Sequence, residues 1–199
     1  MSTRVNRWWL VAGALLLLLL LVLVNFFTFW AARSTTEATH SLSTYRAGDT
    51  MPANMAPGFT LNYAVNGEER LAAALETALS PELERQPNVG TANLITDPTQ
   101  DNPAPFLLVD ITTGRTWTPL YARATITAQV YFAWDGDAPW PLQEPVIFET
   151  SPAIMADGEF SLVDTSWGII SKPAYTDHLA DALAAEIAAA LQNDVFTLP

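Results

Sequence analysis

Residues 121–134 read YARATITAQVYFAW, and their side chains alternate strictly between two kinds. The apolar set is Ala122, Ala124, Ile126, Ala128, Val130, Phe132 and Trp134. The other set carries hydroxyls, an amide and a guanidinium, and it is Tyr121, Arg123, Thr125, Thr127, Gln129 and Tyr131. Alternation with a period of two over 14 residues is typical of a strand with one buried face and one wetter face. The stretch therefore predicts a long half-buried strand rather than a helix.

Shorter strand patterns lie on both sides of this stretch. Residues 59–65 alternate in the same way, and residues 106–111 are apolar on both faces, as in a central strand. Further short strands are predicted at 91–96, 146–149, 159–163 and 166–171, with turns at 113–115 and 157–158.

A helix is predicted directly after the 59–65 strand. Asn66 can cap it, and Glu69 then falls at the third helical position, which resembles a capping box. Ser80 and Pro81 have the form of a new N-cap followed by proline at the first helical position, so a separate short turn is predicted to end at Arg85.

A second helix closes the chain and is expected to begin at Thr176 or Asp177. Its apolar stripe is Leu179, Leu183, Ile187 and Leu191. The order of elements predicts an α+β domain with a mainly antiparallel sheet and two helices packed on it. This order resembles the small sheet-plus-two-helix domains of bacterial envelope assembly proteins, including the outer-membrane lipopolysaccharide-assembly lipoproteins. Those proteins start with a lipidated cysteine, which this chain lacks.

An apolar run lies near the N-terminus, where residues 10–24 read LVAGALLLLLLLVLV. Aromatic residues flank it at Trp8, Trp9, Phe26, Phe27, Phe29 and Trp30. Crossing the ~30 Å hydrocarbon core takes ~20 helical residues, and Trp is enriched at the two membrane interfaces. We therefore expect a single transmembrane signal anchor over residues 10–30, embedded in membrane lipid.

The orientation follows from the positive charges before the run. Arg4 and Arg7 precede it, so residues 1–9 are predicted to be cytoplasmic and the rest of the chain extracytoplasmic. A cleaved signal peptide is the competing interpretation. Its apolar region usually spans about 7–15 residues and ends in an A-x-A-like site, whereas Phe29 and Trp30 precede Ala31 and Ala32 here.

Residues 31–56 are rich in small polar side chains and lack sustained periodicity, so they are interpreted as a tether. Residues 57–199 then form the extracytoplasmic domain. All 21 Asp and Glu residues lie beyond Ser34, against six basic residues, which gives a formal charge of 6 − 21 = −15. This charge is expected to hold the domain away from an anionic bilayer at the end of its tether.

Composition also limits the function classes. Nucleic acid is excluded as an expected partner because the basic residues are few and scattered. The absence of cysteine means that no disulfide framework exists. We expect no cofactor and no metal, because no motif for either is present. A protein partner in the cell envelope is expected instead.

Candidate partner-binding residues come from the wetter face of the long strand and from the tryptophans at its end. They are Tyr121, Arg123, Gln129, Tyr131, Trp134 and Trp140. Tyrosine, tryptophan and arginine supply most of the binding energy in many protein interfaces. The sequence thus favours a membrane-anchored, non-enzymatic binding or scaffolding protein of an envelope complex, with no catalytic residue assigned.

The alternative is a small extracytoplasmic hydrolase or metal-dependent enzyme that uses His178 with nearby aspartates. At helical spacing Asp177 and Asp181 share a face, and His178 lies near Asp181. Three ligands from one helix seldom complete a metal site, and no Gly-x-Ser-x-Gly elbow supports a hydrolase. A deep pocket that converges on His178 with carboxylates from other elements would favour this enzyme.

Overall fold

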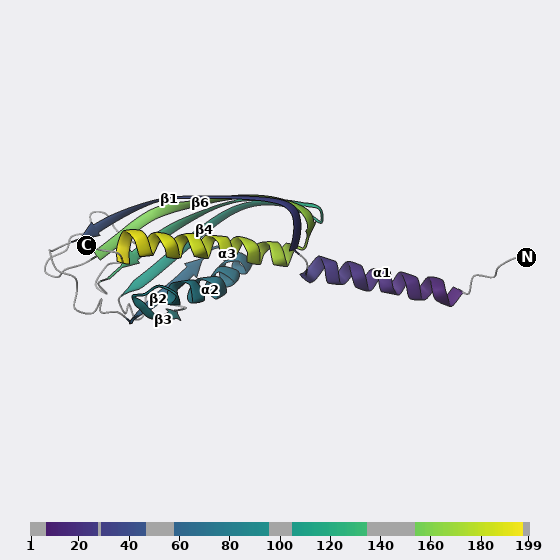
Figure 1. Ribbon diagram of the computed structural model, residues 1–199, viewed down its shortest axis with the longest axis horizontal. Coiled ribbons are helices and arrows are strands. Elements are labelled where there is room, and N and C mark those ends of the chain that lie inside the picture. The colour runs from purple at the N-terminus through teal and green to yellow at the C-terminus, as the bar shows by residue number, and fades with distance from the viewer. Residues whose placement is uncertain (1–6, 28, 47–57, 96–104, 135–153, 197–199) are drawn as a thin grey trace, which may run out of the picture.

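The computed structural model describes residues 7–27, 29–46, 58–95, 105–134 and 154–196. They form a mixed α+β fold, with a curled six-stranded sheet and three α-helices (Figure 1). The strands are β1 (Phe29–Arg46), β2 (Phe59–Asn66), β3 (Val89–Leu94), β4 (Phe106–Thr118), β5 (Tyr121–Ala133) and β6 (Ile154–Ile170). The helices are α1 (Arg7–Phe27), α2 (Glu69–Glu84) and α3 (Lys172–Ala190), and a short π-helix, η2 (Leu191–Phe196), continues α3.

The sheet has the strand order β1-β6-β5-β4-β2-β3. Antiparallel pairing joins β1, β6, β5 and β4, whereas β2 pairs in parallel with both β4 and β3. Helices α2 and α3 both lie on the inner, concave face of the curved sheet (Figure 1). The opposite face is called the outer face below. The predicted α+β class is confirmed.

The alternation in residues 121–134 predicts the two faces of β5 correctly over most of its length. Its apolar positions face the helices and belong to the main core. The apolar stripe of α3 is also buried, from Leu179 through Leu183 and Ile187 to Leu191. Both sets belong to one core, in which α3 packs against α2 and lies next to β1 and β6.

The segment predicted as a tether is largely a strand. Residues 29–46 form β1, which pairs with β6 along its whole length, from Phe29 opposite Ile170 to Arg46 opposite Ile154. Hydrophobic periodicity does not reveal this strand because several inward-facing positions are polar. Ser34, Thr36 and His40 point to the helical face, where they find polar partners instead of an apolar core. The part of the predicted tether from residue 47 to 56 lies outside the described residues.

Two other boundaries differ for local reasons. The turn predicted at 113–115 does not occur: Gly114 pairs with Thr125 inside the β4–β5 ladder, and the chain turns after Thr118. There the Thr118 hydroxyl donates to the Tyr121 carbonyl and accepts from the Tyr121 amide, both at 3.0 Å. Strands predicted at 159–163 and 166–171 are one strand, β6, and Gly158 lies within it rather than in a turn. The strand predicted at 146–149 lies outside the described residues.

Both helices of the domain begin at other residues than predicted. Asn66 ends β2 and donates through Nδ2 to Asp110 Oδ1 at 2.8 Å, so it does not cap α2. Helix α2 instead begins after Glu68 and continues through Pro81, without a separate turn. Helix α3 begins five residues before Asp177, and the side chain of Ser171 caps it by accepting from the Ala174 amide at 3.3 Å.

Helix α1 extends away from one end of the sheet (Figure 1). Its leucines from 15 to 21 are each more than half exposed. Among the described residues, no helix combines the length and apolar content needed to cross a membrane. The helix ends at Phe27, so Phe29 and Trp30, which were predicted to close the anchor, belong to β1.

The pairing of β1 with β6 predicts a difference between two glycine substitutions. A Cβ at Gly158 would meet the Ser41 carbonyl oxygen of β1 at 2.2 Å, whereas a Cβ at Gly114 would meet nothing within 4 Å. We expect Gly158→Ala to lower the free energy of unfolding by roughly 1–3 kcal/mol through steric strain, and Gly114→Ala to leave it nearly unchanged. Urea denaturation measures both, and equal stabilities would contradict the β1–β6 pairing.

Candidate functional site

A fully buried carboxylate, that of Asp164, lies on the helical face of β6. Its Oδ1 accepts hydrogen bonds from the Tyr175 hydroxyl at 2.7 Å and from the Ser166 hydroxyl at 2.9 Å. Its Oδ2 accepts from the Thr36 hydroxyl at 2.7 Å and lies 3.3 Å from Nε2 of His178. A buried charge is tolerated only when it is well hydrogen-bonded, and this carboxylate has partners on both oxygens.

Two strands bring the hydroxyl groups to this carboxylate. Thr36 of β1 lies directly opposite Asp164, and Ser34 lies opposite Ser166. The two serine hydroxyls are 2.9 Å apart, and the Ser34 hydroxyl is also 3.5 Å from Asp164 Oδ2. The alternation of side chains along both strands therefore places all four polar groups on the helical face.

The first turns of α3 supply the remaining partners. Tyr175 and His178 are three residues apart, so they project from neighbouring positions on one helical face. The His178 ring also stacks on Phe29 at the start of β1, with the ring centroids 4.5 Å apart. The Asp164 network thus connects β1, β6 and α3, and it spans residues that are more than 130 positions apart in the chain.

Burial and hydrogen bonding have opposite effects on Asp164. Burial favours the neutral carboxyl and would raise its pKa, but hydrogen bonds from His178, Thr36, Tyr175 and Ser166 favour the anion and hold the pKa below its ordinary value. Burial, with a further contribution from the hydrogen bond to Asp164, raises the pKa of the Tyr175 hydroxyl well above its ordinary value. Tyr175 therefore serves as a hydrogen-bond donor to a carboxylate anion.

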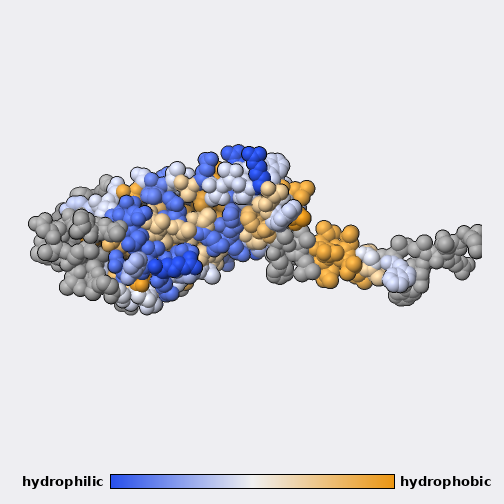
Figure 2. Space-filling view, viewed as in Figure 1, coloured by the Kyte–Doolittle hydropathy of each residue, from blue (hydrophilic) through white to orange (hydrophobic). Residues whose placement is uncertain are grey.

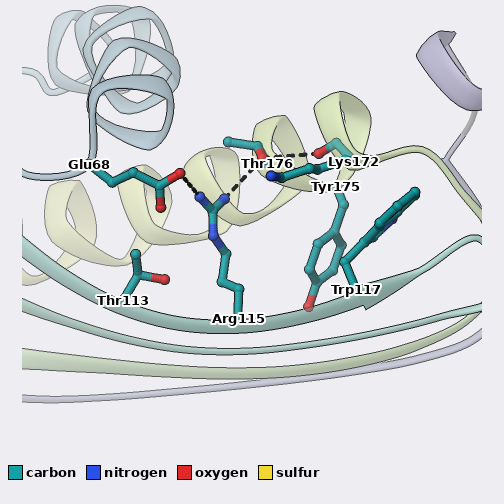
Figure 3. A pocket seen from close by; sticks show the side chains of 7 residues that line it. All are labelled: Glu68, Thr113, Arg115, Trp117, Lys172, Tyr175 and Thr176. Atoms are coloured by element: carbon teal, nitrogen blue, oxygen red, sulfur yellow. Dashed lines mark hydrogen bonds and ion pairs between the residues drawn. The ribbon is translucent and has the colours of Figure 1, made fainter.

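A cavity of about 390 Å³ lies beside this network, between the helices and β4 (Figure 3). Seven residues line it: Glu68, Thr113, Arg115, Trp117, Lys172, Tyr175 and Thr176. The Arg115 guanidinium forms an ion pair with Glu68 and donates to the Thr176 hydroxyl at 3.0 Å. Tyr175 belongs to both the cavity wall and the Asp164 network, whereas His178 is not among the lining residues.

The cavity is polar, and several of its polar groups already have partners. Glu68 compensates Arg115, and the Trp117 indole donates to the Ile170 carbonyl at 3.1 Å. Among the described residues, the Thr113 hydroxyl is buried without a hydrogen-bond partner. This arrangement fixes the start of α3 over β4.

Three of the predicted partner-binding residues are exposed or partly exposed on the outer face. Arg123 and Gln129 are exposed and Tyr121 is partly exposed. Tyr121 packs against Trp167 with ring centroids 4.4 Å apart, and Gln129 donates to Glu159 Oε2 at 2.9 Å. The geometry brings them onto one strand face, as the alternation predicts.

Of the other three predicted residues, two are buried and one lies outside the described residues. Tyr131 is buried on the outer face in a small apolar cluster, whose members are Ala64, Phe106, Leu108, Tyr131, Ala133 and Met155. Burial, with a smaller contribution from the Asp157 charge, raises the pKa of Tyr131 to about 12. Trp134 is buried in the main core, edge-on to Phe59 at 4.9 Å, and Trp140 lies outside the described residues.

The histidine singled out in the sequence has a different partner from the one expected. His178 contacts Asp164 on β6, while Asp177 and Asp181 on its own helix are exposed. Within the described part of the chain, no group of three or more His, Asp or Glu side chains could hold a metal ion. The second histidine, His40, lies in β1 and contacts Glu186 Oε1 of α3 through Nδ1 at 2.8 Å.

Sequence reasoning missed the central residue of this site. Asp164 was left between two predicted strands because it interrupts the apolar pattern of Phe160 and Leu162, which share its face of β6. An acidic side chain at an inward position of an alternating strand was the available signal. Its partners Ser34 and Thr36 gave no such signal in the sequence, because they lie in a segment without hydrophobic periodicity.

Comparisons with known proteins found matches among solved structures. No family model matches the chain, and no curated protein matches it. The PelC dodecamer from Paraburkholderia phytofirmans is similar at 12% identity and a TM-score of 0.41, with 76% of this chain and 98% of that chain covered. A single-substitution variant of that dodecamer, in another crystal form, gives 13% identity and a TM-score of 0.41 over 77% and 99% of the two chains.

The Asp164 network predicts a specific loss of stability in acid. Because the pKa of Asp164 is lower in the folded chain than its ordinary value of 3.8, its contribution is present above that value. The contribution is lost as the pH falls through the lowered pKa. Asp164→Asn should reduce the free energy of unfolding at neutral pH by roughly 1–3 kcal/mol and flatten its pH dependence below pH 3.8.

Urea denaturation from pH 7 to pH 2 measures this effect, with Asp181→Asn as the control because Asp181 is exposed on α3. The control should keep the pH dependence of the unaltered protein. Parallel pH profiles for the unaltered protein and the Asp164 variant would show that the network does not depend on the charge of Asp164.

Proposed function

We propose that this chain is a membrane-anchored binding or scaffolding protein of a cell-envelope complex, without enzymatic activity. In this proposal the apolar helix α1 is the anchor, with residues 1–9 in the cytoplasm, and the α+β domain is extracytoplasmic. The outer face of the sheet binds a protein partner. The observation that carries the proposal is the division of the exposed surface into an apolar helix, which Figure 2 shows, and the polar side chains on the outer face of the sheet.

The anchor is supported by the chemistry of α1. Its leucines are exposed as a continuous run, and soluble monomers rarely expose so large an apolar surface without a partner. The run carries no charged residue from 8 to 27, and a lipid bilayer is a solvent that such a helix matches. The positive charges of Arg4 and Arg7 support the proposed orientation.

The outer face is suited to a protein partner because it is polar and rigid. One row across four strands consists only of hydroxyl side chains, Thr112, Thr127, Ser161 and Thr39. Arg123 lies on the same face, one row from the Tyr121–Trp167 pair. Short side chains on a fixed sheet lose little conformational entropy on binding, and arginine and aromatic side chains are frequent sites of strong binding.

The enzyme alternative rests on the contact between His178 and Asp164. A histidine oriented by a carboxylate can act as a general base. In this chain, however, Asp164 is shared among four further side chains, and the cavity beside it is lined by Tyr175 rather than by His178. We therefore assign the His178–Asp164 contact to the attachment of α3 to the sheet.

The partner surface can be tested by site-specific photocrosslinking of the full chain in its native membrane. A photoreactive residue at Thr125, exposed on the outer face, should give a defined adduct, and one at Thr77, exposed on α2, should give none. Arg123→Glu should lower the yield of the Thr125 adduct at least tenfold, since it reverses a charge at the proposed contact.

The matched control is Arg70→Glu, which makes the same charge change on exposed α2 and should leave the yield unchanged. Equal yields from positions 125 and 77, or equal effects of the two arginine substitutions, would contradict the assignment of the outer face.

The anchor can be tested by placing charges in α1. Replacing Leu17 and Leu20 together by Arg should release the protein from membranes on alkaline carbonate extraction, because each central arginine costs about 2.5–3.5 kcal/mol on insertion. Replacement of both leucines by Ile is the control and should leave the protein in the membrane pellet. Retention of the arginine variant in that pellet would argue against membrane insertion of α1.

A further inference from the structure

Four exposed apolar side chains cluster at the end of the sheet next to α1, and we name them the end patch. They are Trp30 of β1, Leu120 of the β4–β5 turn, and Trp167 and Ile169 of β6. Their exposed fractions are 62% for Trp30, 66% for Leu120, 53% for Trp167 and 36% for Ile169. Large apolar side chains that are exposed together on a protein surface mark an interaction site for another protein or for a membrane.

Hydrogen bonds hold the end patch together as one surface. Trp30 and Ile169 are opposite each other in the β1–β6 ladder. The amide of Gly168 donates to the Leu120 carbonyl at 3.1 Å, and the amide of Ile170 donates to the Pro119 carbonyl at 2.9 Å, so the turn is attached to the end of β6. The Trp167 ring is supported by Tyr121, and its orientation is therefore fixed by packing rather than by solvent.

The length of the connection places the end patch close to α1. Helix α1 ends at Phe27 and β1 begins at Phe29, so only residue 28 separates them. Trp30 is three residues from the end of the helix, and an extended chain of three residues spans at most about 11 Å. No long tether separates the domain from the helix, because the segment predicted to be one is β1.

The charge around the end patch is opposite to that of the whole chain. The net charge of the chain is −12, yet residues 29–36, 111–128 and 165–176 contain no Asp or Glu. These segments hold Arg33, Arg115, Arg123 and Lys172, of which Arg115 is paired with Glu68 on the helical face. Arg33 and Arg123 are exposed, and Arg33 lies directly opposite Trp167 in the ladder. Basic residues beside tryptophan are the side chains that favour the headgroup layer of an anionic bilayer.

From these observations we propose that the domain rests on the membrane through the end patch, with Trp30, Leu120, Trp167 and Ile169 in the headgroup layer of an anionic bilayer. The inference rests on the proposed anchoring by α1. It replaces the expectation, drawn from net charge alone, that the acidic domain stands away from the bilayer. On the outer face, the two rows of the sheet next to the end patch hold Arg33 and Arg123 and contain no Asp or Glu.

Spin labels at single cysteines test the proposal in the full chain, since the protein has no cysteine of its own. The chain is reconstituted in vesicles of phosphatidylcholine and phosphatidylglycerol, and power saturation with oxygen and a water-soluble nickel chelate reports the depth of each label. The three sites are Leu18→Cys in α1, Leu120→Cys in the end patch and Leu94→Cys at the end of β3. Each is exposed, so labelling should preserve the fold.

Leu94 is the matched control for Leu120. It is an exposed leucine that lies beside Tyr63, which in turn pairs with Leu107, about 35 Å along β4 from Thr118. We expect the label at position 18 in the hydrocarbon, the label at 120 at headgroup depth and the label at 94 in water.

Each other result has a distinct meaning. A label at 18 in the hydrocarbon with a label at 120 as wet as that at 94 would overturn the end-patch proposal and leave the anchor intact. Headgroup depth at both 120 and 94 would also overturn it, because the domain would then lie on its side. A label at 18 in water would overturn the proposed anchoring and the end-patch proposal with it.

Discussion

The buried carboxylate of Asp164 is the interaction on which the attachment of β1 depends. It is one charge, and its partners come from β1, β6 and α3. If β1 left the sheet, the carboxylate would lose the Thr36 and Ser34 hydroxyls and would face the cost of an incompletely paired buried anion. The same displacement would separate Phe29 from His178 and His40 from Glu186. An edge strand with few apolar side chains is thus held by polar contacts.

Periodicity in the sequence was sufficient for the elements that bury apolar side chains on one face. The alternation from Tyr121 to Trp134 predicted β5, and the spacing of Leu179, Leu183 and Ile187 predicted the buried stripe of α3. It failed for β1, whose partners lie 108 or more positions later in the chain. Local patterns carry no information about a strand that is stabilised by hydrogen bonds to distant residues.

The candidate site, like the fold, was predicted from the sequence only in part. The exposure of Arg123 and Gln129 followed from alternation alone, but that rule also placed Tyr131 on an open surface. Tyr131 is covered because the outer face has a small apolar cluster of its own, built from β2, β4, β5 and β6. The roles of Asp164 and the end patch could not be predicted, because they depend on which strands are neighbours in the sheet. Leu120 in particular lies in a turn that occurs six residues after the turn predicted at Gly114.

The order of the strands also sets the order of events when the chain is made. Phe29 pairs with Ile170, at a separation of 170 − 29 = 141 residues, so β1 is synthesised long before β6 but cannot pair until β6 exists. Closing contacts across such long separations is slow, because the entropy of the intervening chain is lost first. Until β1 and β6 have paired, β1 lacks its neighbouring strand and β6 has an open edge. The joint between helix and domain therefore forms only after β6 has been made, and any nascent chain that ends before β6 has an incomplete sheet.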